Sequence, residues 1–165
     1  SINYESGYDS FKTPSITNDS VTILGPKDIV RKIDYVDTEF VKLNNVNSDI
    51  QISLSLLKPA FDDLSIDLSM IEYKLEVDQY TEEIATVPVN ILSKENIKYN
   101  YYPKELSVKY FISIDDYKKI TPIDFRIECE LDKNQSTLIP FLTKKPDFVK
   151  NVRLSSNQIQ VIILE

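Results

Sequence analysis

Residues 50–56, with the sequence IQISLSL, alternate apolar and polar side chains without a break. Residues 71–77, with the sequence IEYKLEV, alternate in the same way. A period of two over this length is typical of a β-strand that buries one face. We therefore expect two half-buried strands here, with their apolar side chains turned towards a core.

Further strand patterns lie on both sides of these segments. Residues 21–23 are expected to form a short strand that Gly25 and Pro26 would stop. Residues 83–91 are also expected to be extended. Because proline cannot donate to a strand ladder, Pro88 favours an edge or a crossing for this strand. In the C-terminal half we expect strands over residues 106–111, 125–130, 137–142 and 158–164.

The chain is similar to itself at an offset of 87 residues. Residues 1–78 align with residues 88–165 without a gap, with 14 identical residues at 78 positions. The order of predicted elements repeats as well, and each half has a Lys-Pro-x-Phe motif, at residues 58–61 and 145–148. The last strands fit better with a one-residue slip, which predicts a bulge or a longer turn there. We therefore expect a mainly β chain of two tandem modules, residues 1–80 and 81–165.

Each module is expected to contain one short helix. In the first, Pro26 fits the first helical position, with Asp28 in the first turn and Arg31 and Lys32 in the last. This order of charges complements the helix dipole.

The second helix is expected after Ser113, which could cap it. Here too acidic residues come early and basic residues late, at Asp115, Asp116, Lys118 and Lys119. The apolar side chains expected to face the sheet at helical spacing are Ile29 and Ile33 in the first helix and Tyr117 and Ile120 in the second.

Composition excludes several classes of chemistry. Lys and Arg number 19 and Asp and Glu 26, so the net charge is 19 − 26 = −7, which disfavours a nucleic-acid partner. The chain has no His, which removes the commonest general base and transition-metal ligand. One Cys excludes a disulfide within the chain and a thiolate zinc cluster, and two Gly exclude a glycine-rich phosphate loop. We expect no catalytic residue, no metal ligand, no cofactor and no nucleic acid.

Three acidic pairs are the first candidates for chemistry: Asp62-Asp63, Glu82-Glu83 and Asp115-Asp116. A carboxylate-dependent hydrolase would need two carboxylates in one cleft, roughly 5–9.5 Å apart. Neighbouring residues on a strand point to opposite faces, so we expect solvated surface instead. Ser55 and Lys58 match a Ser-x-x-Lys pattern, in which a helix brings the two side chains together. Here the pattern lies in a predicted strand, so we do not expect a Ser-Lys nucleophile.

Three other features have a structural and a functional interpretation. The basic residues of 144–153 could contact an acidic partner or lipid headgroups, although a solvated connection between strands is the better interpretation. Tyr99, Tyr101 and Tyr102 could bind carbohydrate or protein, but we favour packing at an edge strand or between modules. Cys129 is expected to be a structural thiol, on the face opposite Ile127 or at an edge.

The segment DSVTILGPKDIVRKI, residues 19–33, followed by Val36, Asp37 and Thr38, resembles the signature of YbbR-like repeats. Residues 87–91, VPVNI, resemble the strand between repeats of that family. The second half resembles a degenerate last repeat in residues 102–108, 116–120 and 144–149. It departs from the pattern where Ile112-Ser113 replaces the Gly-Pro pair.

The resemblance implies tandem β-rich modules on the extracytoplasmic side, following an N-terminal membrane anchor, without catalytic residues. It also implies a protein partner, because some family members regulate a membrane-bound diadenylate cyclase. The sequence begins at Ser1 without a signal-peptide pattern, and no apolar run approaches the roughly 20 residues that span a bilayer, so we expect an anchor outside this chain. The leading hypothesis is a non-enzymatic interaction or regulatory module. The alternative is an envelope glycan-binding or scaffold module, and the oligomeric state stays open.

Overall fold

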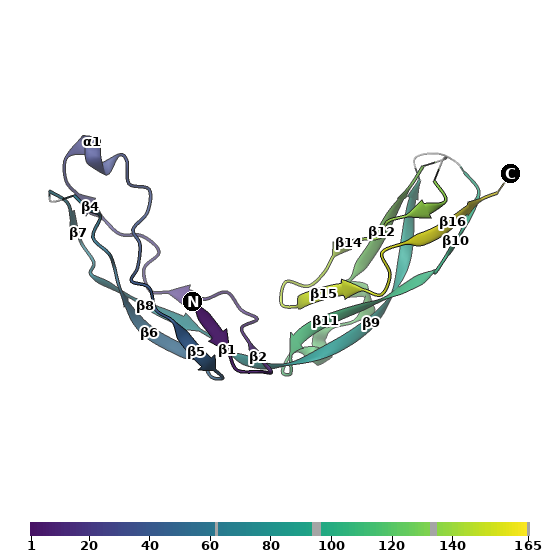
Figure 1. Ribbon diagram of the computed structural model, residues 1–165, viewed down its shortest axis with the longest axis horizontal. Helices are drawn as coiled ribbons and strands as arrows, with labels where there is room; N and C mark the ends of the chain where they lie inside the picture. The colour runs from purple at the N-terminus through teal and green to yellow at the C-terminus, as the bar shows by residue number, and fades with distance from the viewer. Residues whose placement is uncertain (62, 94–96, 133–134, 165) are drawn as a thin grey trace. The chain divides into compact units, whose positions relative to one another are not determined.

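The computed structural model describes residues 1–61, 63–93, 97–132 and 135–164 (Figure 1). Within these ranges the chain is mainly β, as the alternating patterns predicted. Two compact units can be separated, Ser1–Gln79 (unit 1) and Tyr80–Glu165 (unit 2). None of the described helices has the length and apolar character needed to cross a membrane.

Unit 1 is made of short strands in three small sheets. Strands β1 and β5 pair in parallel, β3-β8-β6 form an antiparallel sheet, and β4 pairs with β7. Strand β2 pairs with the first two residues of β9. The bounds are β1 Ile2–Tyr4, β2 Tyr8–Asp9, β3 Ser15–Ile16, β4 Ile23–Leu24, α1 Lys27–Val30, β5 Leu43–Val46, β6 Ile50–Ser55, β7 Ser65–Ile66, β8 Met70–Leu75 and β9 Asp78–Ser93.

Unit 2 has longer strands in two sheets. The larger sheet has the order β14-β12-β9-β11-β15, with β9 and β12 parallel and the other neighbours antiparallel. The smaller sheet has the order β10-β16-β13. The bounds are β10 Tyr99–Tyr102, β11 Glu105–Ser113, η1 Tyr117–Lys119, η2 Pro122–Asp124, β12 Arg126–Leu131, β13 Thr137–Leu138, β14 Phe141–Lys144, β15 Lys150–Leu154 and β16 Ile159–Ile163.

The two units pair their strands in the same order and direction. The sheet β3-β8-β6 of unit 1 corresponds to β10-β16-β13 of unit 2, and β1 with β5 corresponds to β9 with β12. Strands β4 and β7 pair Ile23 with Ile66. Adding 87 to both numbers predicts a pair between residues 110 and 153, and the structure pairs Arg153 with Lys109, one residue away. The 87-residue offset therefore also relates hydrogen-bonded strand neighbours within the two units, with small shifts of register.

The buried core is larger in unit 2 than in unit 1. Fifteen buried residues form one cluster in unit 2, where Val108, Ile112 and Ile127 are fully buried. In unit 1 the corresponding cluster consists of Ile50, Leu75 and Val77, with Ile52 and Tyr73 among the partly buried side chains around it. The alternation over residues 50–56 and 71–77 therefore predicted the inward face correctly.

The helix predictions were only partly right. Helix α1 begins at Lys27, so Pro26 is its cap rather than its first residue, and none of its side chains is buried. The second helix is replaced by two 3-10 turns, η1 and η2, and Ser113 ends strand β11 instead of capping a helix. Proline at the start of η2 cannot continue the preceding helix, and a capping box between Thr121 and Asp124 starts a new turn there.

The apolar side chains of these segments lie differently from the expectation. Tyr117 is 41% exposed and so does not face the sheet, whereas Ile120 packs against the core of unit 2. Because a 3-10 turn has three residues per turn, the spacing that would turn both side chains inward in an α-helix does not apply.

Pro88 does not place its strand at an edge. Strand β9 lies between β11 and β12, and Pro88 is paired with Glu105 of β11. The N–H of Val89 donates to the carbonyl of Lys104 (2.8 Å) on the β11 side. Since successive N–H groups point to opposite sides, Pro88 lacks its donor on the β12 side, where pairing begins only at Val89.

The strand expected over residues 137–142 is broken into β13 and β14. Strand β13 pairs with β16, whereas β14 pairs with β12, so the chain changes sheets at Ile139 and Pro140. Proline at this point cannot donate to either ladder, which explains the break.

The predicted face of Cys129 was also wrong. Cys129 and Ile127 are both 0% exposed and lie on the same face of β12, because residues two apart on a strand share a face. Strand β12 is paired on both sides, so Cys129 is not at an edge. The thiol is buried in the core, as expected for a structural cysteine.

Candidate functional site

A hollow of about 800 Å³ lies in unit 2 where β9 and β12 end and where the chain passes from β13 to β14. It is formed from the ends of strands that belong to both sheets of the unit. Its lining residues are Ile91, Leu92, Ser93, Glu130, Leu131, Asp132, Gln135, Thr137, Leu138, Ile139 and Phe141.

Three of the lining side chains expose apolar surface: Leu92 (48%), Ile139 (62%) and Phe141 (54%). We call these three residues the apolar patch. The register pairs Leu92 with Glu130, and Phe141 with Glu128, so these side chains lie on the outer face of the sheet β14-β12-β9. Exposed apolar patches rimmed by polar residues mark sites of interaction with other proteins.

The hollow is lined by both ionisable and neutral polar side chains. Its ionisable side chains are Glu130 and Asp132, and the remaining polar lining consists of Ser93, Gln135 and Thr137. Among the described residues there is no group of three or more His, Cys, Asp or Glu that could hold a metal ion. Leu92 and Phe141 were not singled out from the sequence, although Leu92 departs from the alternation that turns Val87, Val89 and Ile91 inward.

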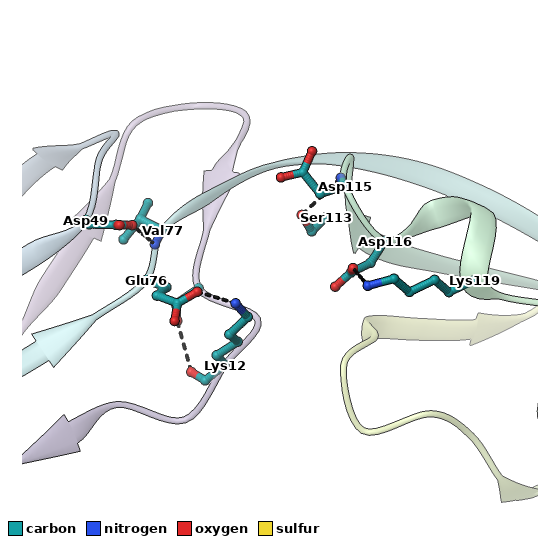
Figure 2. Close-up of polar contacts among 9 residues, drawn as sticks. Lys12, Asp49, Glu76, Val77, Ser113, Asp115, Asp116 and Lys119 are labelled. Carbon is teal, nitrogen blue, oxygen red and sulfur yellow. Dashed lines mark hydrogen bonds and ion pairs between the residues drawn. The ribbon is translucent and has the colours of Figure 1, made fainter.

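The described acidic residues Glu82, Asp115 and Asp116 of unit 2 make contacts with groups close to them. Glu82 lies 3.5 Å from both Lys109 and Arg153, at exposed positions on unit 2. Figure 2 shows Asp116 beside Lys119, and Asp115 close to Ser113, whose hydroxyl accepts from the Asp115 N–H (3.3 Å). These contacts are local and structural.

Other candidates from the sequence are also placed by local structure. Ser55 ends strand β6, and its N–H donates to the Glu39 carboxylate (2.8 Å), so Ser55 and Lys58 do not share a helix. Asp62 lies outside the described residues, so the structure does not place the first acidic pair. In unit 1, Asp49 accepts from the Val77 N–H (2.9 Å), as Figure 2 shows.

The basic segment 144–153 is not a simple connection. Its second part is strand β15, which pairs with β11, and Arg153 is the residue that reaches Glu82. Lys145 remains exposed in the connection that leads from β14 to β15.

The tyrosine cluster divides between two faces of strand β10. Tyr99 and Tyr101 pack against the core of unit 2, whereas Tyr102 is 76% exposed. Strand β10 is an edge of the sheet β10-β16-β13. The hydroxyl of Tyr101 donates to the Val89 carbonyl (2.8 Å), and Lys104 Nζ lies 3.6 Å from the centre of its ring. The three rings therefore do not form one platform on which a sugar could stack.

Replacing Tyr101 by phenylalanine is expected to lower the free energy of unfolding of unit 2 by about 0.5–1.5 kcal/mol, because the Val89 carbonyl loses its donor. The matched control is Tyr102→Phe on the same strand, whose exposed hydroxyl should contribute nothing measurable. Urea unfolding followed by circular dichroism measures both. Equal effects of the two substitutions would contradict the assignment.

The pKa of Asp124 is lowered, first by the N–H of Thr121 (2.8 Å), then by its hydroxyl (2.8 Å), with a smaller contribution from Lys144. A lowered pKa means that the ionised carboxylate stabilises the folded state. This contribution is complete above the ordinary Asp pKa of 3.8 and is lost as the pH falls through the folded value.

We therefore expect Asp124→Asn to weaken the dependence of unit 2 stability on pH below about pH 4. Thermal unfolding between pH 2 and pH 6 provides the measurement, and the Thr121 amide resonance should follow the titration in the original chain. An unchanged pH profile in the variant would show that the capping box carries no charge-dependent stability.

Comparison with known proteins identifies a family for the N-terminal part. Residues 2–63 match the family described as YbbR-like protein. The chain therefore contains a YbbR-like region, as the signature at residues 19–33 predicted, and this region lies within unit 1. Neither the curated proteins nor the solved structures provide a match.

Proposed function

We propose that this chain is a non-enzymatic, extracytoplasmic interaction and regulatory module of a membrane-anchored bacterial protein, built from two tandem YbbR-like repeats. The shared order of strand pairs in units 1 and 2 supports the repeat, and the YbbR-like match supports the family of the first. The apolar patch beside the hollow of unit 2 is the observation that carries the interaction function.

The proposed partner is a membrane-bound enzyme, and the family resemblance makes a diadenylate cyclase the first to test. A regulator of this kind acts by binding one state of the enzyme more tightly than another. The apolar patch consists of three large side chains that are already exposed. A partner could therefore remove their apolar surface from water without any unfolding of unit 2.

The test is photo-crosslinking in cells with a photoreactive phenylalanine at position 141 of the full-length protein. The matched control places the same residue at Tyr117, an exposed aromatic residue of unit 2 that does not line the hollow. We expect a membrane enzyme to be crosslinked from position 141 and not from position 117. Crosslinking only to envelope glycan or structural envelope proteins would favour the scaffold alternative, and equal products from both positions would remove the patch from the proposal.

The location can be tested because the single cysteine is buried. Cys129 is 0% exposed, and burial raises the pKa of its thiol, so the folded chain should be unreactive towards maleimides. A Lys118→Cys variant places a thiol at an exposed position. We expect a membrane-impermeant maleimide to label this variant in intact cells. Labelling only after lysis would overturn the extracytoplasmic location.

A further inference from the structure

Strand β4 of unit 1 has fewer strand neighbours than its counterpart in unit 2. In unit 2, β11 lies between β9 and β15, so both edges of β11 are paired. Within the described part of unit 1, β4 pairs with β7 and forms a two-stranded sheet. The described residues of unit 1 therefore contain no counterpart of the long β9–β11 ladder.

The backbone of β4 shows which groups face this edge. The N–H of Thr22 donates to the Asp67 carboxylate (2.9 Å), and the Thr22 carbonyl accepts from the Asp67 N–H (3.1 Å), so Thr22 faces β7. Successive backbone groups of a strand alternate sides, so those of Val21 and Ile23 face the opposite edge. Their counterparts at an offset of 87, Val108 and Tyr110, pair with Ala85 and Glu83 of β9.

Chain continuity indicates where the missing strand would come from. Residues 80–88 of β9 pair with β11, and residues 89–93 pair with β12. The second pair is parallel, like the pair of β1 and β5 in unit 1. At an offset of 87, Pro88 corresponds to Ser1 (88 − 87 = 1), so residues 80–87 correspond to positions joined directly to Ser1 on its N-terminal side. In unit 1, a backward extension of β1 would run towards β4, β7 and α1 (Figure 1).

Unit 1 also has a partly apolar hollow beside Ser1 and Ile2, where this strand would join the chain. The hollow measures about 280 Å³ and is lined in part by Ile2, Leu43, Ile52, Leu54 and Tyr73. The side chains from the corresponding stretch of unit 2, Ala85 (7% exposed) and Val87 (1%), are buried in the core.

A third difference lies at the far end of the same ladder. Phe111 of β11 stacks against Tyr80 of β9, with ring centres 4.8 Å apart. Its counterpart in unit 1, Leu24, is 64% exposed. Leu24 is thus exposed to solvent at the position where, in unit 2, the Tyr80 ring of β9 packs against the side chain.

We propose that residues 18–26 are a docking edge for one antiparallel strand joined to Ser1, with small apolar side chains at the position before Ser1 and two positions further back. Backbone hydrogen bonds to Val21 and Ile23 would hold the strand, and alternate side chains would fill the apolar hollow. This inference rests on the equivalence of the two units and not on the proposed regulatory function.

The experiment adds a copy of residues 80–87, with the sequence YTEEIATV, directly before Ser1 of the 165-residue chain. We expect amide hydrogen exchange at Val21 and Ile23 to slow at least about tenfold relative to the original chain. The matched control carries Ala85→Asp and Val87→Asp in the added copy only, and it should give no protection, because charged side chains cannot enter the hollow.

Unchanged exchange at Val21 and Ile23 with the YTEEIATV extension would overturn the proposal. Altered exchange at Val108 and Tyr110 instead would also overturn it, because the added strand would then have replaced β9 on β11. Equal protection from the Asp-bearing copy would show that the strand does not use the apolar hollow and would refute the predicted side-chain pattern.

Discussion

Replacing Ile127 by alanine is expected to lower the free energy of unfolding of unit 2 by about 2–5 kcal/mol. Ile127 is 0% exposed in strand β12, which is paired with β9 on one side and β14 on the other. The substitution removes buried methyl groups and leaves a cavity that two paired neighbours prevent from closing.

The control for this substitution is Ile123→Ala, because Ile123 is 83% exposed and belongs to the turn just before β12. It should change the stability by no more than about 0.5 kcal/mol. Urea unfolding followed through amide resonances assigned to unit 2 distinguishes this unit from unit 1. A loss below about 1 kcal/mol for Ile127→Ala would mean that the strand repacks around the smaller side chain.

The same substitution tests the proposed interaction surface. Glu130 lies on strand β12. This strand pairs with β9, which contains Leu92, and with β14, which contains Phe141. We expect crosslinking from position 141 to fall in Ile127→Ala as unit 2 loses stability, and to be unaffected in Ile123→Ala.

Replacing Gly25 by alanine is expected to destabilise unit 1 by about 1–3 kcal/mol. A Cβ atom at this position would overlap the side chain of Leu64 and lie 3.0 Å from the Asp63 carbonyl oxygen. Leu64 is only 3% exposed, so its side chain has little room to move away. This position is the glycine of the Gly-Pro pair, and its role is a close approach between segments.

The explanation can be tested by rescue. In a Leu64→Ala background the overlap with the side chain disappears, so Gly25→Ala should cost clearly less than in the original chain. Gly7→Ala serves as a second comparison, because Gly7 has open space around it but a φ of +88°. Its cost of about 1–2 kcal/mol should be backbone strain that Leu64→Ala does not relieve. Full additivity of Gly25→Ala and Leu64→Ala would rule out the steric explanation.

Local patterns predicted the strands that bury one face. Strand β6 falls within the first segment of unbroken alternation and β8 overlaps the second, and Ile50 and Leu75 are buried as that pattern requires. Here the period of side chains along a strand is sufficient, because it depends on backbone geometry and not on which strands become neighbours.

Long-range pairing decided the positions where the predictions failed. Pro88 indicated an edge or a crossing, and β9 is not at an edge, because the missing donor falls where β12 has not begun to pair. The strand of residues 137–142 divides because its two parts pair with strands from different sheets. The second helix is replaced by two 3-10 turns, the second of which begins at Pro122 with a capping box between Thr121 and Asp124.

The candidate interaction site depended most on tertiary structure. Leu92 is far in the sequence from Ile139 and Phe141, yet all three line one hollow because strand ends of β9, β12, β13 and β14 lie beside it. By itself, the sequence determined the mainly β class, the offset of 87 residues, the YbbR-like signature and the lack of histidine chemistry. Only the tertiary structure decided which apolar side chains stay exposed, since exposure depends on the strands that cover them and not on their spacing.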